Sequence, residues 1–89
     1  MTTLFVRHTV KDYAAWRKAY DSFAPQQKAA GVTAQAVYRA ADNPNDVTVT
    51  HEFASAEKAR AFAGKPELKE AMQKAGVVGA PTVWVTDKA

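Results

Sequence analysis

The chain has 89 residues, two histidines, no cysteine and a formal net charge of +3 at neutral pH. This length fits one domain spanning residues 1–89, and the absence of cysteine excludes disulfides and thiolate metal sites. Two histidines are too few for a structural zinc site without carboxylate ligands, so we predict no metal. Because a chain this short buries only a modest share of its surface, self-association is the expected source of further burial.

The positive charges are scattered among acidic residues and do not form a basic run with interleaved aromatic residues. We therefore expect a solvated helix surface and no nucleic-acid partner. No apolar stretch approaches the ~20 residues that span a bilayer, and the first residues lack the basic and apolar regions of a signal peptide. These observations favour a soluble, cytoplasmic protein with no membrane partner.

The first predicted elements are a strand over residues 4–9 and a helix that follows Asp12. The strand places Leu4, Val6 and His8 on one face and Phe5, Arg7 and Thr9 on the other. Asp12 has the side chain of an N-cap. The helix then carries an apolar stripe of Tyr13, Trp16, Tyr20 and Phe23. Pro25 should kink or split this helix before Gly31 ends it.

The middle of the chain predicts a hairpin. Residues 47–53 (Val-Thr-Val-Thr-His-Glu-Phe) alternate strictly apart from His51 on the apolar side, which indicates a strand with one buried face. Residues 34–39 form the preceding strand, and residues 42–46 (Asp-Asn-Pro-Asn-Asp) supply the turn between the two.

A second helical region follows the hairpin and leads into a final strand. Ser55 is its predicted N-cap. Gly64 and Pro66 interrupt the helix, and Pro66 then begins a further helical stretch that continues to Gly76. Residues 82–86 (Thr-Val-Trp-Val-Thr) form the last predicted strand.

The element order strand, helix, strand, strand, helix, strand predicts an α+β, ferredoxin-like βαββαβ fold. In this fold, helices cover one face of a four-stranded antiparallel sheet. The other face is too apolar to lie wholly in water and too polar for a dry core, so we expect a second copy to cover it. The residues predicted for that face are Phe5, Arg7, Val37, Thr48, Thr50, Glu52 and Trp84.

Several stretches of the sequence together carry a family resemblance. The first strand and residues 12–16 (Asp-Tyr-Ala-Ala-Trp) are the first of them, and four further stretches add to it. They are residues 37–39 (Val-Tyr-Arg), the Asn-Pro-Asn turn at 43–45, residues 51–55 (His-Glu-Phe-Ala-Ser) and residues 75–77 (Ala-Gly-Val). With these features the chain resembles the dimeric α/β-barrel superfamily, which contains the antibiotic-biosynthesis-monooxygenase-like proteins. The resemblance covers nearly the whole chain and implies a homodimer whose two sheets close into one barrel.

The same superfamily holds several kinds of protein. They include cofactor-independent oxygenases, haem-degrading enzymes, isomerases, dehalogenase-like proteins and ligand-sensing modules. Fold likeness alone does not choose among these activities.

His8 and His51 are the first candidates for chemistry, because both fall on the helix-facing side of the sheet. If the first and third strands pair, His8 lies opposite Thr48 or Val49. His51 is then roughly 7–10 Å further along, too far for two ligands of one metal ion. Each histidine is either a general base or anion-binding group, or a buried residue satisfied by hydrogen bonds.

Aromatic residues offer walls for an apolar pocket. Trp16 and Phe23 fit ordinary core packing as well as a binding wall, whereas the hydroxyls of Tyr20 and Tyr38 need partners if buried. Trp84 alternates away from its neighbouring valines, so we expect it at the subunit interface.

Arg7 and Glu52 share the second face on neighbouring strands. Together they predict either an arginine that recognises an anion or a structural cross-strand ion pair.

Two functional hypotheses follow from these residues and from the resemblance. The first is a homodimeric, cofactor-independent monooxygenase-like enzyme acting on a hydrophobic or aromatic small molecule. Its tentative catalytic residues are His51, His8 and Tyr20, and its substrate-binding residues are Trp16, Tyr38 and Arg7. No cofactor is predicted, and haem stays open as a substrate or ligand whose iron a histidine would bind. The second hypothesis is a non-catalytic ligand-binding or structural homodimer.

Overall fold

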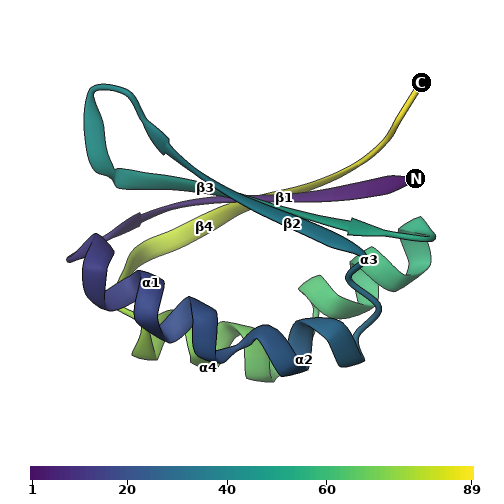
Figure 1. Cartoon of the computed structure of the whole chain (residues 1–89), viewed down its shortest axis with the longest axis horizontal. Coiled ribbons are helices and arrows are strands. Elements are labelled where there is room, and N and C mark those ends of the chain that lie inside the picture. The colour runs from purple at the N-terminus through teal and green to yellow at the C-terminus, as the bar shows by residue number, and fades with distance from the viewer.

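A four-stranded antiparallel sheet forms one layer of the structure, a computed structural model that describes residues 1–89. Its strands are β1 (Thr2–Val10), β2 (Ala34–Ala40), β3 (Asn43–Phe53) and β4 (Val77–Asp87). They lie in the order β2-β3-β1-β4, so the first and third strands are central neighbours. All the helices lie on one side of this sheet, which leaves its other face open (Figure 1). The architecture is the predicted α+β, ferredoxin-like fold.

Each predicted helical region is divided into two helices. The first comprises α1 (Tyr13–Ser22) and α2 (Ala24–Ala29), and the second comprises α3 (Ala56–Ala63) and α4 (Pro66–Lys74). Both divisions follow from proline, which starts a helix well but disrupts its interior. Pro25 lies in the first turn of α2, and α4 begins at Pro66.

Side chains cap α1 and α3 as the sequence predicts. The Asp12 carboxylate accepts a hydrogen bond from the backbone N–H of Ala14 at 3.0 Å. The Ser55 hydroxyl accepts one from the backbone N–H of Lys58 at 3.3 Å. Each cap satisfies a donor that the first turn leaves unpaired.

The register of the central strands differs from the prediction. His8 lies opposite Val47, not Thr48 or Val49, and His51 lies opposite Leu4. The strict alternation of β1 nevertheless holds, because its even-numbered side chains are buried against the helices. The predicted faces of β1 are therefore confirmed although the pairing is shifted.

Strand β2 has the opposite phase from the prediction. Val37 lies opposite Val49 and packs against the buried cluster on the helix side, so its assignment to the second face is wrong. Tyr38 instead lies opposite Thr48 on the open face. Strand β2 is at the sheet edge and carries a mixed sequence, so its alternation is weak and does not fix its register.

The strand ends also extend beyond the predicted ranges. Residues 43–46 belong to β3, so the hairpin turn is confined to Ala41 and Asp42. Strand β4 begins at Val77, five residues before the predicted start, and its register shifts between Arg7 and Thr9 of β1. Gly79 lies in this stretch with a φ of +74°, a backbone conformation that glycine adopts without strain.

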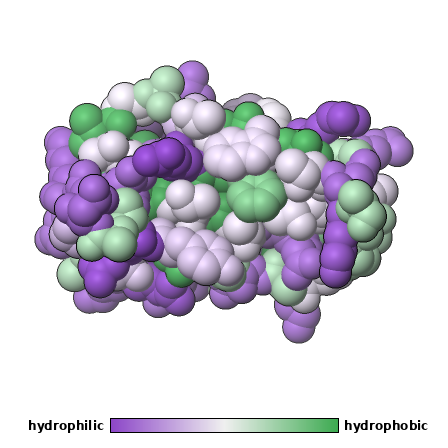
Figure 2. All heavy atoms as spheres, turned by 90° about the horizontal axis from the view of Figure 1, so that it is seen from above, coloured by the Kyte–Doolittle hydropathy of each residue, from purple (hydrophilic) through white to green (hydrophobic).

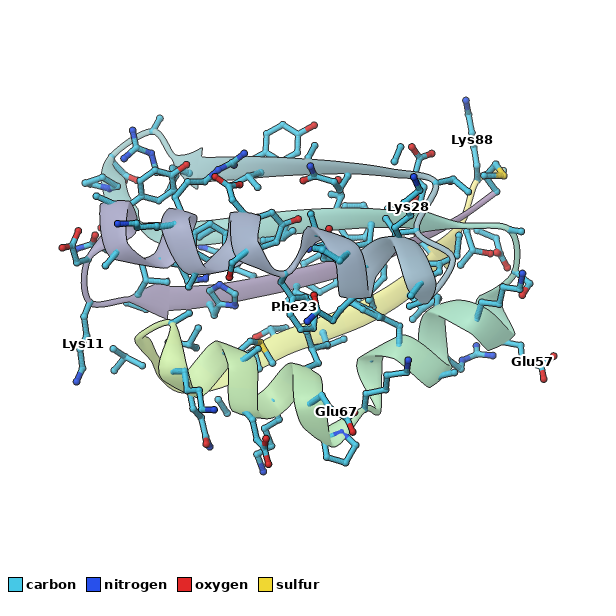
Figure 3. All side chains as sticks on the ribbon, turned by 60° about the horizontal axis from the view of Figure 1, so that its bottom comes forward. Lys11, Phe23, Lys28, Glu57, Glu67 and Lys88 are labelled. Carbon is cyan, nitrogen blue, oxygen red and sulfur yellow. The ribbon has the colours of Figure 1, made fainter.

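Two buried clusters hold the helix layer on the sheet. One joins Leu4 and Phe53 to Phe62 of α3, and the other joins Val47 and Val49 to Trp16 of α1. Charged side chains of the helices, of the turn after β1 and of the C-terminal end lie at the periphery, as Figure 3 shows for Lys11, Glu57, Glu67 and Lys88. None of the helices has the length and apolar character needed to cross a bilayer.

Candidate functional site

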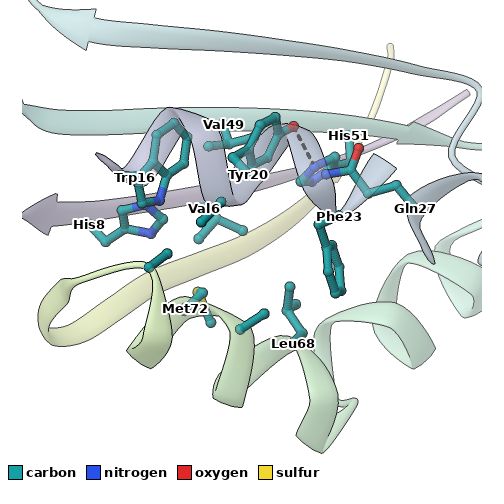
Figure 4. Close-up of a pocket in the computed structure, with 13 residues that line it drawn as sticks. Val6, His8, Trp16, Tyr20, Phe23, Gln27, Val49, His51, Leu68 and Met72 are labelled. Atoms are coloured by element: carbon teal, nitrogen blue, oxygen red, sulfur yellow. Dashed lines mark hydrogen bonds between the residues drawn. The ribbon is translucent and has the colours of Figure 1, made fainter. Parts of the chain in front are cut away.

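A cavity of about 50 Å³ lies between the sheet and the helices (Figure 4). Strands β1 and β3 form its floor, and α1, α2 and α4 form its walls. No Lys, Arg, Asp or Glu lines it. Its lining residues are Val6, His8, Trp16, Ala19, Tyr20, Phe23, Gln27, Val49, His51, Leu68, Ala71, Met72 and Ala75.

His51 lies in the floor and is only 4% exposed. Its Nε2 atom lies 3.0 Å from the Tyr20 hydroxyl, which in turn donates to Oε1 of Gln35 at 2.9 Å. Its Nδ1 atom is buried and has no hydrogen-bond partner. Burial lowers the pKa of His51 to about 4, because a charged imidazolium is poorly solvated there. At neutral pH the ring is therefore neutral and has one unprotonated nitrogen.

His8 lies in the same floor, and neither of its ring nitrogens has a hydrogen-bond partner. Its ring meets that of Trp16 edge-on, with centroids 5.6 Å apart. Burial lowers its pKa, although the negative charge of Asp46 acts in the opposite direction. A neutral imidazole has one donor and one acceptor, and leaving both buried and unpaired costs ~1–3 kcal/mol each. A hydrogen-bonding group in the cavity would remove that cost.

The two histidines lie farther apart than predicted. His51 is opposite Leu4, which is four residues from His8 on β1, so the two positions are about 13 Å apart along the strand. This separation again excludes a metal ion shared by both rings. The histidines therefore offer two separate polar points in one apolar cavity.

Helix α1 supplies an aromatic wall. Trp16 is 2% exposed and stacks on Tyr20, with ring centroids 4.9 Å apart and planes 18° from parallel. Phe23 continues the wall and points toward α4 (Figure 4). Trp16 and Phe23 thus combine the two roles that the sequence left open, since they pack the core and line the cavity.

Tyr38 and Arg7, the other predicted substrate-binding residues, do not line this cavity. Tyr38 is 58% exposed on the open face of the sheet. Arg7 also lies on that face and binds Asp46 through two hydrogen bonds of 3.0 and 2.6 Å. This bidentate contact raises the pKa of Arg7, and its hydrogen bond together with the positive charge lowers the pKa of Asp46.

The predicted ion pair between Arg7 and Glu52 is wrong. Arg7 lies opposite Thr48, so Asp46 is two residues away on the same face of β3 and Glu52 is four residues away. Only Asp46 is within reach, because cross-strand contacts extend to diagonal neighbours two residues on.

Sequence reasoning missed several lining or supporting residues, among them two glutamines and two residues of α4. Gln27 and Gln35 lie in stretches without clear periodicity, and the register that places Gln35 opposite His51 does not follow from local sequence. Leu68 and Met72 lie in the predicted helical stretch that begins at Pro66, but apolar residues at helical spacing do not by themselves show that a helix faces a cavity.

No protein-family model and no curated protein sequence matches the chain. Solved structures match it closely in shape. A protein from Bordetella bronchiseptica assigned to the antibiotic biosynthesis monooxygenases superposes with a TM-score of 0.83 at 15% identity, over 99% of this chain and 96% of that one. A variant of SnoaB, a cofactor-independent oxygenase from Streptomyces nogalater, has a TM-score of 0.77 at 14% identity, over 98% and 91%.

A third similar structure has no known function. The NE2512 protein from Nitrosomonas europaea has a TM-score of 0.74 at 22% identity, over 96% of this chain and 85% of that one. At such identities the likeness shows the fold and not the activity. The chain has the fold of antibiotic biosynthesis monooxygenase-like structures, which confirms at the level of the fold the resemblance drawn from its sequence.

Proposed function

We propose that the chain is a homodimeric, cofactor-independent monooxygenase-like enzyme that binds an uncharged hydrophobic or aromatic molecule in this cavity. One observation supports this proposal above all: His8, His51 and Tyr20 all line a single cavity whose other lining residues, apart from Gln27, are apolar, and no charged residue lines it. Polar groups placed at a few points of an apolar pocket orient a ligand and single out one of its atoms. A purely structural homodimer would have each polar group satisfied on its own, whereas three imidazole nitrogens here have no partner.

His51 is the proposed base. It would remove a proton from a hydroxyl of an aromatic ligand. The resulting anion would supply the electrons that reduce dioxygen and add it at a ring carbon as a hydroperoxide, which would lose water and leave one oxygen atom on the ligand as a carbonyl. A pKa of about 4 keeps the ring unprotonated at neutral pH, but it also makes the ring a weak base in the empty cavity. A ligand anion formed beside the ring favours the charged imidazolium and raises this pKa, so proton transfer is assisted by the ion pair that it creates.

The cavity must widen to hold such a ligand. Its volume of about 50 Å³ suits a few water molecules, whereas sites for drug-sized ligands measure ~300–1,000 Å³. Helix α4 is the wall that we expect to move. It has no buried residue, and its N-cap, Lys65, makes no side-chain capping bond. Few buried contacts correspond to a low free energy of local opening.

The open face of the sheet supports the proposed homodimer. Trp84 is 40% exposed there and stacks on Phe5, with ring centroids 5.1 Å apart. Seen directly in Figure 2, neutral and apolar side chains occupy the middle of this face, with hydrophilic ones toward both ends. A second copy of the sheet would remove this surface from water, with the aromatic pair as its centre.

Native mass spectrometry of the freshly purified protein tests the proposal. We expect a dimer that carries an uncharged organic adduct, and oxygen uptake when the identified adduct is added back. His51→Gln should abolish the uptake, while Tyr38→Phe, outside the cavity, should leave it unchanged. Oxygen uptake that survives in His51→Gln would remove His51 from the mechanism, and binding without any uptake would favour the non-catalytic alternative.

A further inference from the structure

A hydrogen-bonded chain of three side chains crosses from the edge of the sheet into the cavity. It runs from Gln35 on β2 through the Tyr20 hydroxyl on α1 to Nε2 of His51 on β3. Gln35 and His51 are directly opposite each other in the strand register, and α1 places Tyr20 between them. The two contacts, of 2.9 and 3.0 Å, share the same phenolic oxygen.

The orientation of the Gln35 amide, whose Oε1 atom faces the phenol, determines which nitrogen of His51 carries the proton. A phenol has one proton, and Tyr20 donates it to the amide oxygen of Gln35. The oxygen of Tyr20 can then only accept from His51, so Nε2 must carry the proton of the neutral ring. The other nitrogen, Nδ1, is left unprotonated, and it is the atom that is buried without a partner.

We infer that Gln35 is a positioning residue that fixes the tautomer of His51 through Tyr20 and so leaves Nδ1 as the proton acceptor of the site. This inference rests on the proposed role of His51 as a base. Gln35 itself does not line the cavity. Its amide oxygen acts on the tyrosine, and the tyrosine acts on the imidazole.

The tautomer of His51 that carries its proton on Nε2 also limits which ligands can form a hydrogen bond with the ring. An unprotonated Nδ1 accepts a hydrogen bond and cannot donate one. It therefore pairs with a hydroxyl or N–H group of an uncharged ligand and offers nothing to a carbonyl oxygen. With Nδ1 protonated instead, the same ring would bind a carbonyl and would have no free nitrogen to receive a proton.

Long-range hydrogen–nitrogen correlation NMR of the imidazole rings in the ligand-free protein tests this inference. The chain has only two histidines, so His8→Gln assigns both rings, and His8 serves as an internal reference. We expect His51 protonated at Nε2 in the natural protein. Gln35→Glu keeps an acceptor and should preserve this tautomer. Gln35→Lys presents only donors to the tyrosine oxygen, which frees the phenolic proton for Nε2 and should move the ring proton to Nδ1.

Two results would overturn the inference. One is a His51 protonated at Nδ1 in the natural protein, a measurement that needs no variant. The other is a folded Gln35→Lys protein in which Nε2 stays protonated, with folding checked by the backbone amide spectrum of the same sample. Neither result depends on turnover or on ligand binding. If oxygen uptake disproves the proposed function, the tautomer assignment by NMR still holds. If NMR disproves the tautomer assignment, oxygen uptake still decides whether the protein is catalytic.

Discussion

At the scale of single residues, the apolar surroundings of His51 make stability depend on pH. Its pKa is about 4 in the folded chain and close to 6.5 when exposed, so the unfolded chain binds a proton more readily between these values. The contribution of the neutral, buried His51 to the free energy of unfolding is complete above about pH 6.5 and is lost as the pH falls through about 4. Urea unfolding from neutral pH to pH 4 should show a decrease of ~3 kcal/mol from this residue.

His51→Gln is the control for that pH dependence, because glutamine does not titrate. The free energy of unfolding of this variant should change much less over the same range. His8 has a pKa lowered in the same direction, so a smaller slope should persist in His51→Gln and become smaller still in the double variant, with only the contribution of Asp46 left near pH 4. An unchanged slope in His51→Gln would show that His51 is not held neutral by burial.

The hydroxyl of Tyr20 gives a second prediction at this scale. Tyr20→Phe leaves Nε2 of His51 without its partner, and an unsatisfied buried group of this kind costs ~1–3 kcal/mol. Tyr38→Phe removes an exposed hydroxyl and should change stability by less than ~0.5 kcal/mol. Equal effects of the two substitutions in chemical unfolding would contradict the role given to the Tyr20–His51 contact.

These residues also show where sequence reasoning succeeds and where it stops. His51 was identified because it interrupts a strict alternation, and Tyr20 because it shares a helical stripe with Trp16. Tyr38 was misplaced because an edge strand with a weak pattern does not determine its own phase. Gln35 has no local signal at all, since its significance comes from a partner sixteen residues away in the chain.

At the scale of elements, α4 is the least anchored wall of the cavity. It buries no residue, whereas α1 buries Trp16 and α3 buries Ala59 and Phe62. Backbone amides of α4 should therefore exchange with solvent faster than those of α1 and α3. A ligand that fills the cavity should slow the hydrogen exchange of the α4 amides more than that of the α1 and α3 amides. Hydrogen exchange that is slower in α4 than in α1 would contradict the account of how the cavity opens.

The two side-chain caps give a matched pair of substitutions. Asp12→Ala and Ser55→Ala should each cost ~1 kcal/mol, because each removes the acceptor for a donor in the first helical turn. Asp12→Ala should also weaken ligand binding, since α1 carries the aromatic wall. Ser55→Ala should leave binding unchanged, because α3 contributes no lining residue. If Asp12→Ala and Ser55→Ala change ligand binding equally, the result would contradict a specific contribution of α1 to binding.

Elements were predicted well where proline, capping residues and alternation agree. The prolines correctly divide both helical regions, and the N-caps at Asp12 and Ser55 are confirmed. The long β4 was shortened in the prediction because glycine and proline between residues 79 and 81 indicate a loop. The structure accommodates them with a register shift at the sheet edge, a solution that local propensity does not reveal.

At the scale of the whole molecule, the open face of the sheet predicts self-association. Trp84→Asp places a charge within the aromatic pair with Phe5 and should convert a dimer into a monomer in analytical ultracentrifugation. Val83→Asp is the control. Val83 is next to Trp84 and similarly exposed, but it lies opposite Val6 on the helix side. A natural protein that is monomeric at micromolar concentration would contradict the proposed assembly.

The central claim is that the cavity binds an uncharged hydrophobic molecule, and NMR of Trp16 tests it most directly. The chain has two tryptophans, so Trp84→Phe identifies the indole N–H signal of Trp16. Titration with naphthol should shift this signal in the natural protein, with a weaker effect in His51→Leu. Naphthoate has a similar size but is an anion, and it should bind far less because no cationic residue lines the cavity. A Trp16 signal that does not shift with naphthol, or that shifts equally with naphthoate, would contradict the claim that the cavity binds uncharged hydrophobic molecules.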